Sequence, residues 1–262
     1  MAYETILYER KGKITYITLN RPQILNAVND TLNRECVEAF REFDGDEEAW
    51  VAILSGKGRC FSSGADVKQR QLRPREELVR LGGPAGVRPP GGPLGLGETV
   101  NWKPVIAAVH GYVIGVGLGM AMDCDLVVAA EDTQFQIREV ERGLGGPRHW
   151  VNAWFWGGGR FATEVALTGR FFSAQEAHQL GIVNRVVPLD QLMAEAERLA
   201  DEILSNPPLA VRCNTRVSRW YVHRMIEEAG MYGQALKLHL TEDFQESALA
   251  FMEKRQPVFK GK

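Results

Sequence analysis

Cysteine, net charge of either sign and long apolar runs are all scarce in this chain of 262 residues. Its four cysteines (Cys36, Cys60, Cys124 and Cys213) lie far apart without a C-x-x-C pair, which excludes the common zinc spacings and a disulfide framework. The formal net charge of −2 gives no overall basic excess of the kind that attracts nucleic acid or an anionic membrane. No window approaches the ~18 apolar residues of a membrane span. We therefore expect neither a nucleic-acid nor a membrane partner.

The first residues, "MAYETILYERKGKITYITLNRP", combine early acidic residues with no long apolar run. This pattern is neither that of a signal peptide nor that of an Arg-rich transit sequence. Together with the scattered cysteines, it predicts a cytoplasmic protein. A length of 262 residues fits one large domain, or a main domain with an appended piece.

The first half of the chain predicts alternating strands and helices. Two β-rich runs on either side of Lys11-Gly12 predict an antiparallel hairpin. A helix is expected from Asp30, a candidate N-cap, to Gly45, and "WVAILSG" predicts a strand covered on both faces. A polar helical segment over 67–81, interrupted by Pro74, follows. Residues 82–97 hold seven glycines and four prolines, which predicts a loop or a lid.

The second half predicts mostly helices. After about residue 160 only "GIVNRVVP" has the composition of a strand, and Ser173 with Glu176 forms a capping-box pattern. Strand and helix alternation followed by helices predicts an α/β core with a helical C-terminal part.

The same local arrangement of buried strand, turn with small residues and helix occurs twice, over Val51–Asp66 and over Val105–Met122. Such turns leave unpaired N–H groups at the start of a helix, with a positive partial charge. Two of them side by side could hold one developing oxyanion, and small residues would let the ligand approach the backbone. Close helix–strand packing is the alternative for either turn. Gly115, Gly117 and Gly119 also resemble a dinucleotide turn, but Met120 stands near the place of the third fingerprint glycine.

Several longer blocks resemble the crotonase (enoyl-CoA hydratase/isomerase) superfamily, in the same order. They are "LNRPQILNAV", "GKGRCFSSGADVK", "KPVIAAVHGYVIGVGLGMAMDCDLVVAAEDTQF", "ALTGRFFSAQEAHQLGIVNRVVP" and "FMEKRQPVFKGK". The resemblance implies a crotonase-like α/β spiral of ββα units over residues 1–200 and a helical oligomerisation region over 201–262. It also implies an acyl-CoA substrate, a homotrimer or a hexamer built as a dimer of trimers, and no metal or cofactor beyond the CoA moiety of the substrate.

The resemblance also assigns roles to particular residues. It implies that the Ala65 and Val116 N–H groups form the oxyanion hole, although the family usually has glycine in place of Val116. Ser63 and the segment of Arg21 would contact the nucleotide or the pantetheine arm of CoA, and Val67 would line the acyl pocket. Lys260 of a neighbouring copy would contact a phosphate. The alternative for Arg21 and for Lys260 is a solvated charge on the protein surface.

The acid/base pair departs from the family. Family hydratases use two glutamates, of which the first would fall at Gly119 and the second at Glu139. Glycine carries no proton, whereas Glu139 alone can move one proton next to a thioester enolate. Glu141, two residues on, is either a pocket residue that replaces the missing first glutamate or, because side chains at i and i+2 of a helix point apart, a surface carboxylate near Arg138 or Arg142. Position 119 itself is expected to line the substrate pocket.

An unusual stretch, "GLGGPRHWVNAWFWGGG", offers further pocket candidates. His149 is either a second acid/base group, a substrate contact or a structural histidine. Trp150, with Trp154 and Trp156, lines an acyl pocket or an interface between subunits. The predicted function is an acyl-CoA enzyme of the hydratase/isomerase type, a lyase or an isomerase. The alternatives are a CoA-thioester lyase or hydrolase of the same family, an acyl-CoA-binding protein with little or no catalysis, and the NAD-binding protein that the dinucleotide-like turn would indicate.

Overall fold

The computed structural model describes residues 3–84, 102–234 and 236–262. Its elements in chain order are β1 (Ile6–Lys11), β2 (Ile14–Leu19), η1 (Pro22–Ile24), α1 (Asp30–Gly45), β3 (Val51–Gly56), α2 (Val67–Arg70), α3 (Arg75–Leu81), β4 (Val105–Val109), β5 (Tyr112–Ile114), α4 (Val116–Met122), β6 (Leu126–Ala130), β7 (Gln134–Gln136), η2 (Val140–Arg142), α5 (Pro147–Gly157), α6 (Gly159–Thr168), β8 (Phe171–Ser173), α7 (Ala174–Gln179), β9 (Arg185–Val187), η3 (Leu189–Gln191), α8 (Leu192–Leu204), α9 (Pro208–Gln234), η4 (Leu238–Leu240) and α10 (Glu242–Glu253).

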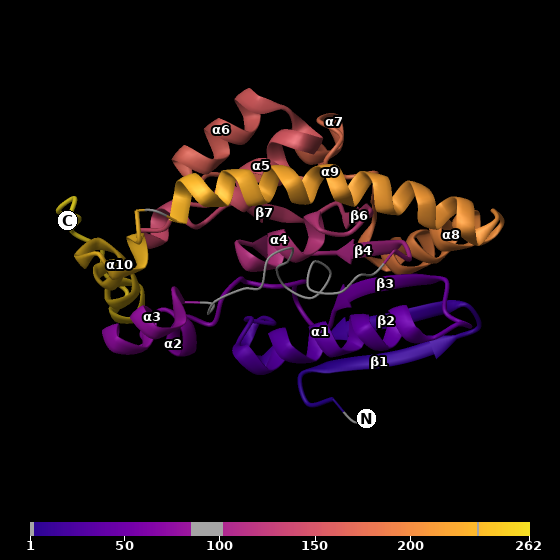
Figure 1. Cartoon of the computed structure of the whole chain (residues 1–262), viewed down its shortest axis with the longest axis horizontal. Coiled ribbons are helices and arrows are strands. Elements are labelled where there is room, and N and C mark those ends of the chain that lie inside the picture. The colour runs from indigo at the N-terminus through magenta and orange to yellow at the C-terminus, as the bar shows by residue number, and fades with distance from the viewer. Residues whose placement is uncertain (1–2, 85–101, 235) are drawn as a thin grey trace.

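The described strands form two sheets. The larger has the order β1-β2-β3-β4-β6-β9, in which β1 and β2 are antiparallel and the other neighbours are parallel. The smaller has the order β5-β7-β8, in which β5 and β7 are parallel and β7 and β8 are antiparallel. Figure 1 shows the hairpin β1–β2 at one edge of the molecule and the long helix α9 extending along the other side.

Strands β3 and β4 are covered on both faces, which accounts for their continuous apolar sequences. On one face, Ile53 and Ile106 pack in a cluster with Leu199 of α8. On the other face, Leu54 and Ala107 belong to the larger core cluster. Since both faces are buried, the carboxyl ends of these strands are the parts that can open into a site.

The structure confirms the α/β class with a helical C-terminal part and the N-terminal hairpin. Two local predictions were wrong. Asn29 caps α1 in place of Asp30, because the Asn29 side chain accepts the Leu32 N–H at 2.9 Å. Phe171–Ser173 forms strand β8 in a region expected to be helical, since Phe172 is buried and stacks on Phe135 of β7.

The segment over 67–81 divides into α2 and α3 around Pro74, as predicted. The predicted loop over 82–97, with its predicted role over the acyl pocket, lies outside the described residues from position 85 onward. The proposed boundary at residue 200 falls within α8 and stays a prediction. Within the described part of the chain, no helix combines the length and the apolar character that crossing a membrane requires.

Candidate active site

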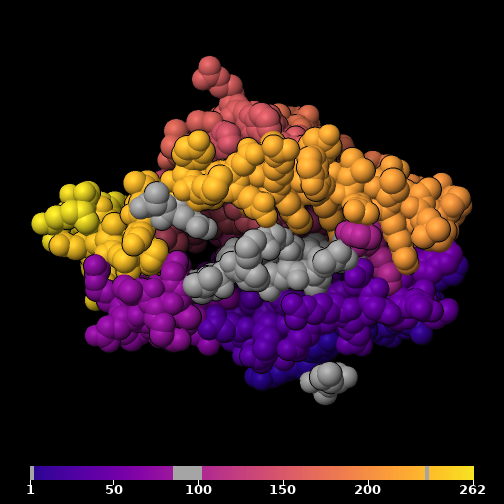
Figure 2. All heavy atoms as spheres, in the orientation of Figure 1, coloured from indigo at the N-terminus to yellow at the C-terminus, as the bar shows by residue number. Residues whose placement is uncertain are grey.

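A cavity of about 1670 Å³ lies between the two glycine-rich turns, the segment from Arg138 to His149 and helices α2, α3 and α9. Figure 2 shows the surface hollowed between α9, in orange, and the purple segment that carries α2 and α3. The described lining includes both turns that the sequence singled out, through Ser63–Val67 and Ile114–Val116. The cavity is therefore the place where the predicted chemistry can be tested against geometry.

Hydrogen bonds join the two turns directly. The Ser62 N–H donates to the Tyr112 carbonyl at 3.0 Å, and the Ile114 N–H donates to the Ser62 carbonyl at 3.1 Å. Gly64 has a φ of +96°, and a Cβ at this position would lie 3.0 Å from the Ile114 carbonyl oxygen. A Cβ on Gly117 would lie 2.7 Å from the Ser62 Cβ. These glycines therefore let the two turns meet.

The backbone N–H groups of Ala65 and Val116 have no acceptor among the described residues, and both residues line the cavity. On either side of Ala65, the Gly64 carbonyl and the Asp66 N–H bond to Val28, which leaves the intervening amide unpaired. Val116 is the first residue of α4, so its N–H has no partner within the helix. The structure thus places both predicted donors at one cavity, outside the hydrogen-bonded ladders.

The Glu139 carboxylate lies beside the second turn. A Cβ on Gly115 would lie 3.0 Å from Glu139 Oε1, and Gly115 has a φ of +50°. Glu139 follows β7 as the N-cap of η2, and its side chain is 15% exposed. Its Oε2 atom is buried and has no hydrogen-bond partner. One carboxylate oxygen therefore has no partner among the described residues, beside the turn at Gly115 that leads into Val116.

His149 holds the other oxygen of Glu139. It lies in the first turn of α5, is buried, and places Nε2 2.9 Å from Glu139 Oε1. Burial by itself raises the pKa of Glu139, but the charge and hydrogen bond of His149 outweigh it, so the pKa lies below its ordinary value. The carboxylate is then ionised at neutral pH and able to accept a proton. The His149 Nδ1 atom is buried without a partner.

The structure brings some predicted site residues together and leaves others outside. Those that line the cavity are Ser63, Ala65, Val67, Val116, Glu139 and His149. Those that do not line it are Arg21, Gly119, Glu141, Trp150 and Lys260.

Two of the outlying residues had been considered for the reaction centre or the pocket. Glu141 pairs with Arg138 at 3.0 Å and accepts from Gln136 at 3.0 Å, so it is the surface carboxylate that the sequence left as one of two alternatives. Trp150 donates to the Thr163 hydroxyl at 3.2 Å and stacks on Trp154, which places it against α6 rather than in the cavity.

The remaining three outlying positions have other surroundings. Gly119 is buried inside α4, so this position supplies no side chain to the cavity. Arg21 pairs with Asp66 at 3.4 Å, and Asp66 also caps α2. Lys260 pairs with Glu242 at 3.4 Å in its own chain. Its predicted contact with the ligand of a neighbouring copy stays a prediction.

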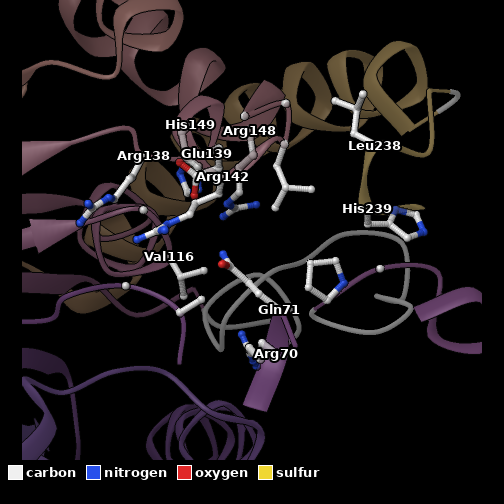
Figure 3. Close-up of a pocket in the computed structure, with 18 of the residues that line it drawn as sticks. Arg70, Gln71, Val116, Arg138, Glu139, Arg142, Arg148, His149, Leu238 and His239 are labelled. Carbon is white, nitrogen blue, oxygen red and sulfur yellow. The ribbon is translucent and has the colours of Figure 1, made fainter. Parts of the chain in front are cut away.

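The sequence reasoning missed four polar residues of the cavity wall. Arg70, Gln71, Arg142 and Arg148 all line the cavity. Figure 3 shows Arg142 and Arg148 grouped with Glu139 and His149, while Arg70 and Gln71 lie across the pocket from them. The only available signal was the position of Arg142 three residues after Glu139. No group of three or more His, Cys, Asp or Glu side chains within the described ranges could hold a metal ion.

Two converging turns with unpaired amides beside one buried carboxylate are the kind of arrangement with which enzymes stabilise an oxyanion through backbone donors. A model of the enoyl-CoA hydratase/isomerase family matches residues 9–262. The chain is 35% identical over 271 residues to a probable enoyl-CoA hydratase of Mycobacterium tuberculosis, which covers 99% of both chains. It is 36% identical over 276 residues to the carnitinyl-CoA dehydratase of Escherichia coli, again covering 99% of both chains.

Solved structures agree with this match. The crystal structure of a carnitinyl-CoA hydratase from Mycobacterium avium superposes with a TM-score of 0.84 and 32% identity, covering 98% of this chain and 99% of that one. The chain therefore belongs to the enoyl-CoA hydratase/isomerase family, the crotonase superfamily, and has its fold. The resemblance in the sequence blocks is confirmed, and the dinucleotide interpretation of the Gly115–Gly119 turn finds no support in the comparisons.

Proposed function

We propose that this protein is an acyl-CoA enzyme of the hydratase/isomerase type that works through a thioester enolate. The observation that carries the proposal is the pair of unpaired Ala65 and Val116 amides beside the ionised Glu139 carboxylate in one cavity. The two amides donate to the thioester oxygen as negative charge develops on it, and Glu139 takes the proton from the adjacent carbon. The reaction needs no cofactor beyond the CoA moiety of the substrate.

A shift of the double bond is the reaction that Glu139 can complete without a second acid or base. Glu139 removes one proton from the α or γ carbon, the enolate forms, and the same carboxyl returns the proton at the other carbon. His149 already engages its Nε2 atom with the Glu139 carboxylate, at 2.9 Å. Its position supports a role in holding Glu139 rather than in direct proton transfer to substrate.

Hydration or dehydration is the second candidate, and the similarity to a probable enoyl-CoA hydratase and a carnitinyl-CoA dehydratase favours it. Adding water requires one group to deprotonate the water and one to protonate the α carbon. With Gly119 at the place of the first glutamate, Glu139 would have to handle both protons.

The test begins with Glu139→Gln. In D₂O, the wild type is expected to exchange the α protons of a saturated acyl-CoA, which reports enolate formation whichever reaction is natural. The substitution is expected to slow exchange by ~10²- to 10⁴-fold while leaving acyl-CoA affinity within about twofold. Unchanged exchange would contradict the proposed base, and a wild type that binds acyl-CoA without exchange would be a binding protein.

Mass spectrometry of a panel of enoyl-, aryl- and cyclic acyl-CoAs separates the two reactions. A product of unchanged mass with a shifted double bond supports isomerisation, whereas the gain or loss of one water mass supports hydration or dehydration. An assay with the acyl-CoA in heavy-oxygen water identifies hydration independently.

We also propose that the protein is a homotrimer or a hexamer. Helix α9 exposes large apolar side chains that suit an interface between copies, among them Leu209, Trp220, Tyr221, Met231 and Tyr232. Light scattering after size exclusion is expected to give three or six chains per particle. A monomer at micromolar concentration would contradict this.

A further inference from the structure

Arg142 is a buried guanidinium that pairs with no carboxylate of the described residues. It is 9% exposed and lines the cavity. Its contacts are a long hydrogen bond to the Ser247 carbonyl, at 3.4 Å, and the Phe251 ring, whose centroid is 4.1 Å from Cζ. No described carboxylate lies within ion-pair distance of it. Buried charges in proteins are normally paired, so this group has capacity for an anionic partner.

The surroundings of Arg142 increase the need for an anion. Burial, followed by the charge of neighbouring Arg138, lowers the pKa of Arg142 to about 10. The side chain therefore stays cationic at neutral pH, although its surroundings oppose the charge. The nearest acidic residue in the sequence, Glu141, is already paired with Arg138 at 3.0 Å.

Arg142 lies close to Glu139, and therefore close to the place where the acyl group would react. The Arg142 N–H donates to the Glu139 carbonyl at 3.0 Å, so one 3₁₀ turn joins the two residues. In such a turn the side chains at i and i+3 eclipse, which puts Arg142 on the side of Glu139. Since Glu139 acts next to the thioester carbonyl, Arg142 is within reach of the first atoms of the acyl chain. The pantetheine arm keeps the CoA phosphates far from that point.

The opposite wall offers further unpaired polar atoms. Arg70 is 2% exposed and its Nη1 atom has no partner, while Gln71 is 7% exposed and its Oε1 atom has none. Both residues line the cavity, and Figure 3 shows the Gln71 amide directed toward the side that holds Val116. Arg70 already pairs through Nε with Asp30 at 3.2 Å, so its spare capacity is at Nη1. A purely hydrocarbon acyl chain would leave Arg70 Nη1, Gln71 Oε1 and the Arg142 guanidinium without an added partner.

We propose that the acyl group of the substrate carries a carboxylate near its reacting carbons, bound by Arg142 with Arg70 and Gln71 on the facing wall. This inference rests on the proposed acyl-CoA function and names the class of acyl group. The chemistry is recognition of an anion by a guanidinium, and a phosphate of CoA is the other source of such an anion.

The test compares pairs of acyl-CoAs of equal chain length, one with a terminal carboxylate and one with a terminal methyl group. The pairs are succinyl- and butyryl-CoA, glutaryl- and valeryl-CoA, and adipyl- and hexanoyl-CoA, with free CoA and dephospho-CoA measured alongside by calorimetry. Wild type is expected to bind the carboxylated member of at least one pair about tenfold or more tightly. Arg142→Gln is expected to abolish that preference while leaving the affinity for the methyl-ended member and for free CoA unchanged.

Controls separate the outcomes. Arg142→Lys keeps the charge and is expected to retain part of the preference, whereas Arg160→Gln removes an exposed arginine outside the cavity and should retain all of it. Equal affinities within every pair, or a preference that survives Arg142→Gln, would overturn the inference. An equal loss of free CoA binding in Arg142→Gln would identify the phosphates as the anion and overturn it too. If no CoA compound binds wild type, the proposed function itself fails.

Discussion

His149 is expected to set the pH at which Glu139 works. In the structure the His149 ring is the side-chain partner of the carboxylate, at Oε1, and Oε2 has no partner among the described residues; the backbone N–H groups of Arg138 and Glu139 also lower the Glu139 pKa. Replacing His149 by Phe leaves a ring of similar size and removes that partner. A hydrogen bond to a charged group contributes about 1.5–3 kcal/mol. Removing His149 therefore removes a group that lowers the Glu139 pKa, and that pKa is expected to rise.

Loss of His149 is expected to move the acid limb of the pH profile to higher pH. His149 lowers the pKa of Glu139 against the effect of burial, so the wild-type carboxylate ionises at a lower pH than it would alone. In His149→Phe, the acid limb of kcat/KM therefore moves to higher pH, and α-proton exchange in D₂O moves with it. Activity near the alkaline plateau should recover most of the lost rate, because the base itself is intact.

His149→Gln supplies the matched control. The Gln amide can donate one hydrogen bond to Glu139 but carries no charge, so its acid limb should lie between those of wild type and His149→Phe. Melting temperatures measured across the same pH range show whether each variant is folded. An acid limb that stays in place in folded His149→Phe would refute the idea that His149 holds the base.

Three further outcomes follow from local geometry. Gly115→Ala is expected to destabilise the fold by about 1–3 kcal/mol in urea titrations and to reduce exchange, because φ is +50° and the new Cβ would meet Glu139 Oε1; wild-type stability would contradict this. Glu35→Gln is expected to cost about 1–3 kcal/mol, because buried Glu35 accepts from the Thr5 hydroxyl and the N–H groups of Glu4 and Thr5. Burial raises the pKa of Glu35, but these hydrogen bonds lower it below its ordinary value. The stabilisation is therefore present above the pKa of Glu35 in the unfolded chain and is lost as the pH falls through its pKa in the folded protein. Parallel curves of stability against pH for wild type and Glu35→Gln would refute this. Val116→Gly should keep exchange within about tenfold, since the donor is a backbone N–H, and complete loss would indicate that the side chain itself is required.

Local sequence signals predicted a large part of the fold. The apolar runs gave β3 and β4 because strands buried on both faces need no polar alternation. Pro74 marked the break between two helices, because α2 ends at Arg70 and α3 begins after Pro74 as its N-cap. Strand β8 escaped prediction because three residues are too few to show a period, and its pairing with β7 is a contact between distant segments.

The positions of the two glycine-rich turns and of Glu139 can be read from the sequence alone. The positive φ angles of Gly64 and Gly115 are a local reason for glycine at those two positions. Contacts across the fold decided the rest. His149 reaches Glu139 from helix α5, and Glu141 pairs with Arg138 instead of lining the cavity. Arg142 is buried, and no carboxylate of the described part of the chain pairs with it. A sequence shows which side chains can ionise, but only their burial and their neighbours across the cavity determine which of them stay charged, paired or available.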